Sequence, residues 1–160
     1  MEKYVNDLKI CPLFDHIEPH HLITMLRCLG AKIIHYKKNQ NIFTEGNPAT
    51  HLGIVLTGQV QIIRIDYYGN RSIVANLGPS HLFGESFACA GINALPVNVT
   101  ATCDTTVLLI DCQRILKTCN NACVFHSQII FNLMKVVATK NILFNQKIEI
   151  ISKRSTKEKL

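Results

Sequence analysis

The sequence lacks several features that define large classes of proteins. No apolar run approaches the ~18–20 residues that a membrane-spanning helix needs. The N-terminus, MEKYVNDLKICPLF, carries acidic residues and has no apolar stretch of ~7–15 residues, so no signal peptide is predicted. Without a secretion signal, the seven irregularly spaced cysteines are expected to be reduced thiols. We therefore expect a cytoplasmic protein with no membrane partner.

Motifs for common kinds of catalysis are missing as well. The glycines in residues 53–58 (GIVLTG) lack the lysine of a phosphate loop, and there is no nucleophile elbow or paired-carboxylate motif. His20 and His21 do not form the His-x-His, with a Glu a few residues later, that a metal-dependent jelly-roll enzyme needs. The chain is therefore predicted not to be an enzyme, with no catalytic residue, no metal and no cofactor.

Positive charge is concentrated at one end of the chain. The net charge is +6, and seven Lys/Arg against two acids in residues 135–160 supply five of those charges. Residues 1–134 are nearly neutral, so we do not expect a nucleic-acid-binding face on them. Only the C-terminal tail is expected to approach a phosphate backbone.

The hydrophobic period divides the chain into helical and β-type parts. Residues 17–29 have apolar side chains at helical spacing, with Pro19 near the start and Gly30 after the end. Residues 31–111 carry short alternating segments separated by glycines, and residues 67–70 (YYGN) are predicted to form a hairpin connection. Many short strands with close turns indicate a sandwich or barrel rather than alternating β and α units.

The helical period returns after Asp111, with a short helix predicted over 112–120 and a long one over 122–152. A seam with steps of three and four residues runs along the long helix and consists of Ile130, Leu133, Val137, Asn141, Phe144, Ile148 and Ile151. About 30 residues at 1.5 Å rise give ~45 Å, more than a small β-domain can cover. We interpret the seam as a parallel homodimer interface whose polar Asn141 sets the register; the alternative is a helix packed on its own β-domain.

An ordered set of segments carries a resemblance to a known family. They are YKKNQNIFTEG at 36–46, LTGQV at 56–60, the YYGN turn, LGPSHLFGES at 77–86, and a last strand that leads into a long helix. In this order the chain, from about Leu13 to Leu160, resembles the cyclic-nucleotide-binding-type effector domain of the Crp/Fnr (catabolite-activator/fumarate-nitrate-regulator) transcription factors.

The resemblance implies a mainly β fold with flanking helices: a double-stranded β-helix (jelly roll) followed by a long C-terminal dimerisation helix. It places a sensor domain with an N-terminal helix at residues 1–121, the dimerisation helix at 122–152 and a hinge at 153–160. In the family, DNA is bound by a helix-turn-helix domain that follows this helix, and we expect that domain to lie beyond Leu160.

The residues expected at a cyclic-nucleotide site match the family only in part. Members that bind these ligands use a Gly-Glu turn and, further on, an Arg-Ser or Arg-Thr pair. Gly84 and Glu85 match the turn, but Leu95 and Pro96 occupy the second pair and supply no charge, hydroxyl or N–H. Because a charge-assisted hydrogen bond contributes ~1.5–3 kcal/mol, roughly 10–150-fold in affinity, we expect the effector not to be cyclic AMP.

The resemblance places an effector pocket around this turn. Its predicted residues are Phe83, Gly84, Glu85, Ser86, Leu95, Pro96, Val97, Leu143 and Phe144. Their apolar character suits an aromatic or otherwise hydrophobic small molecule of unknown identity. An alternative role for Glu85 is purely structural, capping the backbone of the short turn.

The cysteines leave three alternatives open. Cys119, Cys123 and His126 would share one helical face and could hold a metal. Thiols could also sense redox state. The interpretation that we favour is structural: Cys28, Cys89 and Cys103 are small core side chains, and the group at 119–126 is at the surface or serves packing.

Two functional hypotheses follow. The first is the effector-sensing and dimerisation part of a Crp/Fnr-family regulator, coupling a small-molecule or redox signal to DNA binding. The alternative is a stand-alone small-ligand-binding or interaction module without DNA binding.

Overall fold

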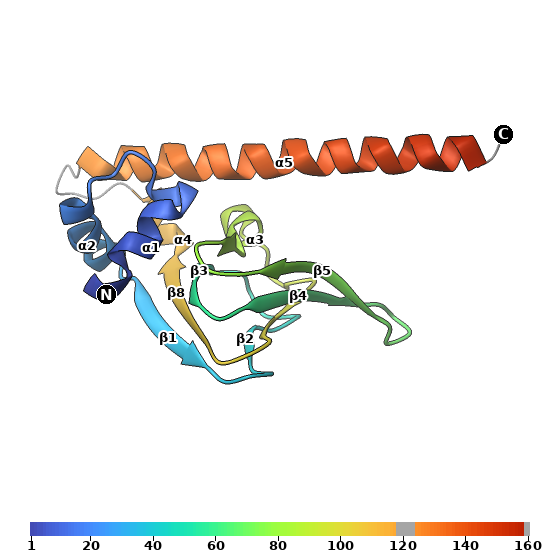
Figure 1. Cartoon of the computed structure of the whole chain (residues 1–160), viewed down its shortest axis with the longest axis horizontal. Coiled ribbons are helices and arrows are strands. Elements are labelled where there is room, and N and C mark those ends of the chain that lie inside the picture. The colour runs from blue at the N-terminus through green and yellow to red at the C-terminus, as the bar shows by residue number, and fades with distance from the viewer. Residues whose placement is uncertain (118–123, 159–160) are drawn as a thin grey trace.

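The computed structural model describes residues 1–117 and 124–158: a β-sandwich, short N-terminal helices and a long C-terminal helix (Figure 1). The helical elements are η1 (Glu2–Tyr4), α1 (Val5–Ile10), η2 (Pro12–Phe14), α2 (Pro19–Cys28), α3 (Glu85–Ala90), α4 (Cys112–Leu116) and α5 (Val124–Glu158). The strands are β1 (Lys32–Tyr36), β2 (Asn41–Phe43), β3 (His51–Thr57), β4 (Val60–Ile65), β5 (Arg71–Leu77), β6 (Leu82–Phe83), β7 (Asn98–Ala101) and β8 (Thr105–Asp111).

The strands form two four-stranded antiparallel sheets, in the orders β1-β8-β3-β6 and β2-β7-β4-β5. This sandwich, with its flanking helices and long last helix, confirms the predicted fold class. The YYGN connection is also confirmed, because it joins β4 to β5 with the Asp66 N–H bonded to the Asn70 carbonyl at 3.0 Å. The short strands β2 and β6 were not predicted, since three and two residues are too few to show an alternating pattern.

Two hydrophobic clusters share the central strands β3 and β8, because successive side chains of a strand point to opposite faces. Val55 and Val107 belong to the cluster between the two sheets. Leu56 and Leu108 belong to the cluster between the first sheet and the helices. Both strands are therefore buried on both faces, which explains their nearly continuous apolar sequence.

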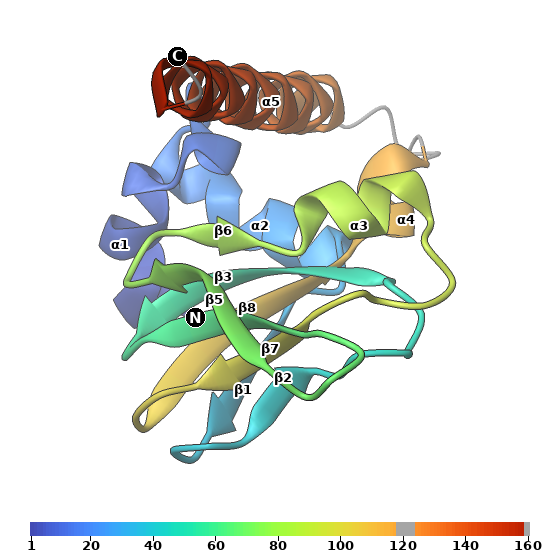
Figure 2. The same cartoon turned by 90° about the vertical axis from the view of Figure 1, so that its right-hand side faces the viewer.

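The first part of α5 packs on the chain's own N-terminal helices (Figures 1 and 2). Ile129 and Leu133 are buried in the helical cluster, and the Asn132 amide donates to the carbonyl oxygens of Leu13 (3.0 Å) and Asp15 (2.7 Å). The expectation that Leu133 faces a partner subunit is therefore corrected, because its side chain is already covered within the chain. Ile130 and Val137 are half-buried against the same cluster.

The second part of α5 extends beyond this contact and is exposed from Asn141 to Arg154. The hinge expected at 153–160 is corrected over residues 153–158, which continue the helix. No Gly or Pro interrupts residues 124–160, and Lys153 pairs with Glu149 one turn earlier at 2.6 Å, so nothing in the sequence ends the helix at residue 152. Two further helices lie near their predicted positions, α2 within 17–29 and α4 at the start of 112–120. Residues 118–120 of the latter range lie outside the described residues.

Candidate functional site

A tight turn at Gly84 connects β6 to α3 and sets the geometry of the candidate site. Gly84 has φ +77°, in the left-handed region that favours glycine. A Cβ atom at this position would also lie 2.7 Å from the Phe43 ring. Phe43 in turn packs on Phe83, with ring centroids 5.4 Å apart. The backbone conformation and the close contact both require glycine here.

A cavity of about 340 Å³ lies next to this turn, between the ends of β1, β2, β3 and β8 and the 44–50 loop. Its lining includes Lys32, Ile34, Phe43, Thr44, Asn47, His51, Gly84, Leu95 and Leu109. Sequence reasoning found only Gly84 and Leu95 of this set. The β1 and 44–51 residues were missed because nothing in their local sequence links them to Gly84, and only the tertiary fold brings them to it.

The segment around Leu95 closes one side of the cavity. Leu95 is buried, its N–H donates to the Asn47 carbonyl at 2.9 Å, and its carbonyl accepts from the Gly46 N–H at 2.9 Å. Pro96, which follows, is exposed and has no N–H. These two residues therefore offer a bound anion neither a cation nor a free backbone donor, as the sequence indicated.

The remaining predicted pocket residues lie elsewhere. Phe83 and Val97 are buried, whereas Ser86 is exposed at the surface of α3. Leu143 and Phe144 are about half exposed on α5 and do not line the cavity. In one copy of the chain, the structure thus brings together the turn and Leu95 but not the α5 residues.

Glu85 makes a contact that the sequence did not reveal. Its side chain is 3% exposed, and Oε1 accepts a hydrogen bond from Lys140 Nζ of α5 at 2.5 Å. Lys140 also donates to the Leu82 carbonyl at 3.1 Å, while Glu85 Oε2 is buried without a hydrogen-bond partner. Glu85 makes no side-chain capping bond to α3, so the alternative of a turn cap is not what the structure shows. The sequence did contain a signal for this contact. Lys140 lies seven residues after Leu133, so the two side chains are on the same face of the helix.

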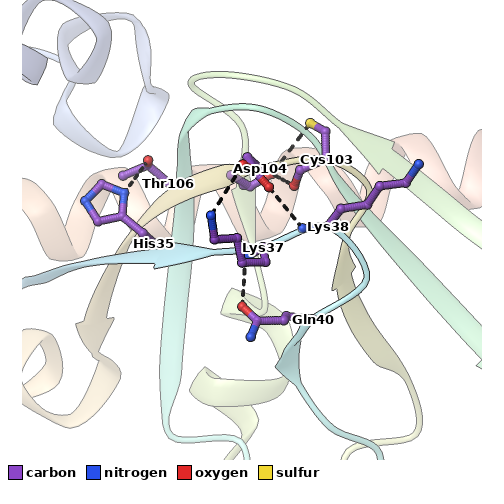
Figure 3. Close-up of polar contacts among 8 residues, drawn as sticks. His35, Lys37, Lys38, Gln40, Cys103, Asp104 and Thr106 are labelled. Atoms are coloured by element: carbon purple, nitrogen blue, oxygen red, sulfur yellow. Dashed lines mark hydrogen bonds and ion pairs between the residues drawn. The ribbon is translucent and has the colours of Figure 1, made fainter.

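A second cavity of about 370 Å³ lies near the β1–β2 and β7–β8 turns and is lined by residues that include His35, Lys37 and Asp104. Figure 3 shows its contacts: His35 Nδ1 lies 2.8 Å from Thr106 Oγ1, and Lys37 Nζ lies 3.9 Å from the Asp104 carboxylate. Asp104 also accepts from the Lys38 N–H at 3.3 Å. These contacts tie the two turns together, which gives them a structural role.

The residues considered for a metal site are only partly described. Cys119 and Cys123 lie outside the described residues. His126 is buried, and its Nε2 donates to the Arg114 carbonyl at 2.9 Å, so this nitrogen is already engaged within the chain. Over residues 1–117 and 124–154, no three His, Cys, Asp or Glu side chains gather closely enough to hold a metal ion. The same part of the chain has no helix with the length and apolarity to cross a membrane.

Comparison with known proteins places these observations in a family. The family described as Cyclic nucleotide-binding domain matches residues 33–122, more than half of the chain. The CRP-like cAMP-activated global transcriptional regulator of Mycobacterium tuberculosis is 29% identical over 73 residues. That match covers 46% of this chain and 32% of the relative, so the chain matches about a third of that regulator's length.

Solved structures share the fold. The Thermus thermophilus Catabolite Activator Protein superposes with a TM-score of 0.74 at 23% identity, covering 88% of this chain and 63% of that one. A cyclic nucleotide-binding domain from Methylobacillus flagellatus gives 0.76 at 17% identity, covering 92% and 83%. The sensor domain of the transcriptional regulator DNR from Pseudomonas aeruginosa gives 0.70 at 17% identity and covers 90% of each chain.

Proposed function

Because the chain belongs to the cyclic nucleotide-binding domain family, we propose that it is the effector-sensing and dimerisation part of a Crp/Fnr-type transcriptional regulator. Its effector is a small molecule other than cyclic AMP. Binding next to the Gly84 turn shifts the position of α5, and α5 passes this change to the DNA-binding domain that the resemblance to Crp/Fnr factors predicts. The M. tuberculosis relative, a global transcriptional regulator, supports the regulatory role.

The contact between Glu85 and Lys140 carries this proposal. Gly84 lines the cavity, and the next residue, Glu85, is bonded to α5 at 2.5 Å. A ligand that displaces the turn must therefore move or break a charge-assisted hydrogen bond to the long helix. A ligand shifts an equilibrium between two states only if it binds one of them more tightly than the other. The bond between Glu85 and Lys140 links the turn to α5, so the ligand can bind with different affinity to two positions of α5.

The exposed half of α5 supports self-association. Among the seam residues, Phe144, Ile148 and Ile151 are 56–66% exposed in a single chain. A helix that projects such side chains into water is stabilised when a second copy covers them. We therefore assign the dimer interface to the second half of the predicted seam, with Asn141 at its start.

Sedimentation tests the dimer directly. We expect Phe144→Glu to weaken self-association by at least tenfold, because burying a carboxylate without a partner is strongly unfavourable. Ile10→Glu is the matched control, since Ile10 is also exposed (73%) but belongs to α1 and not to the seam of α5. An unchanged dimer constant for Phe144→Glu would remove Phe144 from the interface.

Two measurements address the effector. Calorimetry with cyclic AMP should show no binding at micromolar concentration; a micromolar dissociation constant would refute our interpretation of Leu95 and Pro96. Native mass spectrometry of the purified protein should identify any small molecule that it carries.

The alternative is a ligand-binding module without DNA binding. The reading frame after the Leu160 codon distinguishes it from the regulator. A helix-turn-helix sequence there supports the regulator, and a stop codon supports the stand-alone module.

A further inference from the structure

Two cysteines that are distant in the sequence meet between α3 and α4. Cys89 lies near the end of α3 and Cys112 is the first residue of α4, and these short helices lie side by side (Figure 2). Their Sγ atoms are 3.5 Å apart, although 23 positions separate the residues.

The two thiols differ in exposure and in proton affinity. Cys112 is buried, whereas Cys89 is only partly buried. A hydrogen bond from the Cys112 thiol to the Cys89 sulfur lowers the pKa of Cys89, against the opposing effects of burial and of the Glu85 charge. The same hydrogen bond, followed by burial, raises the pKa of Cys112. Cys89 is therefore the thiol that ionises first and that a solute can reach.

We propose that Cys89 and Cys112 form a redox-active dithiol that a hydroperoxide converts into an intramolecular disulfide. The Cys89 thiol first loses its proton, and the thiolate attacks the peroxide, so that the O–O bond breaks and an S–O bond forms. The alkoxide (hydroxide, for hydrogen peroxide) leaves and takes up a proton, equivalent to the one released by Cys89, to give the alcohol or water. The Cys112 sulfur then attacks the resulting sulfenic acid: the S–S bond forms, the S–O bond breaks, and the hydroxyl group leaves with the thiol proton as water. Two thiols are oxidised by two electrons and one peroxide is reduced.

The surrounding structure allows the sulfur atoms to close. They must approach from 3.5 Å to about 2.05 Å, a shift of roughly 1.5 Å. Helix α3 has only six residues and is bounded by Gly84 and Gly91, both with positive φ. Adding a Cβ at Gly91 would meet nothing within 4 Å, so the Cys89 end of the helix has space around it. The small approach that the bond needs can therefore be met by an adjustment of this short helix near Gly91.

The disulfide would act on the same turn that α5 contacts. Glu85 and Cys89 are one helical turn apart on α3, and Glu85 is bonded to Lys140. Oxidation would therefore fix α3 to α4 next to the turn that contacts the long helix. This chemistry does not depend on the proposed regulatory function, and the test below reads the bond itself.

Peptide mapping of the whole protein tests the proposal. The protein is oxidised with a stoichiometric amount of hydrogen peroxide, alkylated, and digested without reduction by trypsin and an Asp-specific protease. Cleavage after Arg71 and Arg114 and before Asp104 and Asp111 separates Cys112, in residues 111–114, from Cys119 and Cys123. Cys89 and Cys103 share residues 72–103. We expect these two peptides to become linked, with the loss of two hydrogen atoms and of the alkylated 111–114 peptide.

Variants identify the partner and keep the test decisive. Cys103→Ser is the matched control and should leave the link intact, because Cys103 is exposed and its only described contacts are with Thr105. Cys89→Ser should abolish the link. Cys112→Ala should leave Cys89 as a sulfenic acid that a 1,3-diketone traps. Far-UV circular dichroism checks that each variant is folded.

The unmodified protein provides a second measurement that needs no variant. Under native conditions Cys89 should be alkylated before Cys112. Three results would each overturn the proposal. They are an alkylated 111–114 peptide after oxidation, a link from Cys112 to residues 118–135, and a link that persists in Cys89→Ser.

Discussion

The bond between Lys140 and Glu85 gives the sharpest test of how α5 is attached to the β-sandwich. The substitution Lys140→Met keeps most of the side-chain length and its apolar contacts but removes the ammonium group. Glu85 Oε2 already has no hydrogen-bond partner, so this change leaves both oxygens of a buried carboxylate without one. The Leu82 carbonyl loses its bond to Lys140 as well.

The expected magnitude follows from burial. Removing one partner of a fully buried ion pair costs about 3–5 kcal/mol, because the other charge remains uncompensated. The Lys140 side chain is 38% exposed, so water can reach part of the site and reduce this penalty. We therefore expect Lys140→Met to lower the free energy of unfolding by about 2 kcal/mol. In a chain of this size that corresponds to a Tm lower by about 4–8 °C.

The assay is urea unfolding at fixed protein concentration, because self-association would otherwise change the apparent stability. Lys135→Met is the matched control: Lys135 is exposed on the same helix, and its substitution should change stability by less than about 0.5 kcal/mol. In the double variant with Glu85→Gln, about 1 kcal/mol or more should be recovered, because the uncompensated charge is gone. If Lys140→Met and Lys135→Met have equal stability, the ion pair does not hold α5 and our mechanism of coupling fails.

Three further predictions concern other parts of the structure. Leu133→Ala should lower the free energy of unfolding by about 2–5 kcal/mol in urea titrations, because Leu133 is buried within the chain; a change below 1 kcal/mol would contradict its place in the core. Gly84→Ala should be more destabilising than Gly91→Ala by about 1 kcal/mol or more, since both have positive φ but only Gly84 would place a Cβ against Phe43; equal losses would show that this contact relaxes freely. Burial raises the pKa of Cys11 from 9.0 to about 11. The contribution of this thiol to stability is therefore complete below pH 9 and is lost, by up to roughly 3 kcal/mol, as the pH rises through 11. The corresponding fall in unfolding free energy should be smaller in Cys11→Ala, and an identical pH profile would exclude this thiol as its source.

Local patterns predicted the framework of the fold. The alternation in β5, the YYGN turn and the helical spacing before Gly30 are properties of neighbouring residues, and each appears where expected. Strands β2 and β6 were not predicted because they are too short to show an alternating hydrophobic pattern. They form through pairing with β7 and β3, respectively. The extension of α5 past residue 152 was missed because the apolar seam ends at Ile151, although no Gly or Pro ends the helix there.

The candidate site was less accessible to sequence reasoning. Gly84 and Leu95 were found from the resemblance, but His51 and Lys32 were not, because their role depends on the 44–51 loop closing over β1. The seam on α5 shows the same limit. A spacing of three and four residues indicates that one face is covered, and it does not say whether the chain's own helices or a second copy covers it.

The sequence by itself thus determined most of the longer elements, the sandwich-or-barrel class and the long last helix, which depend on local spacing and residue type. Through the family resemblance it also indicated the mismatch at Leu95 and Pro96. Only the tertiary structure decided that Leu133 faces inward, that Lys140 compensates Glu85 and that Cys89 lies 3.5 Å from Cys112. Cys89 and Cys112 are 23 positions apart in the sequence, and Glu85 and Lys140 are 55 positions apart. Leu133 is buried against helices that are distant in the sequence. The physical reason is that contacts across such separations are set by the packing of whole elements, which the period of a single segment does not specify.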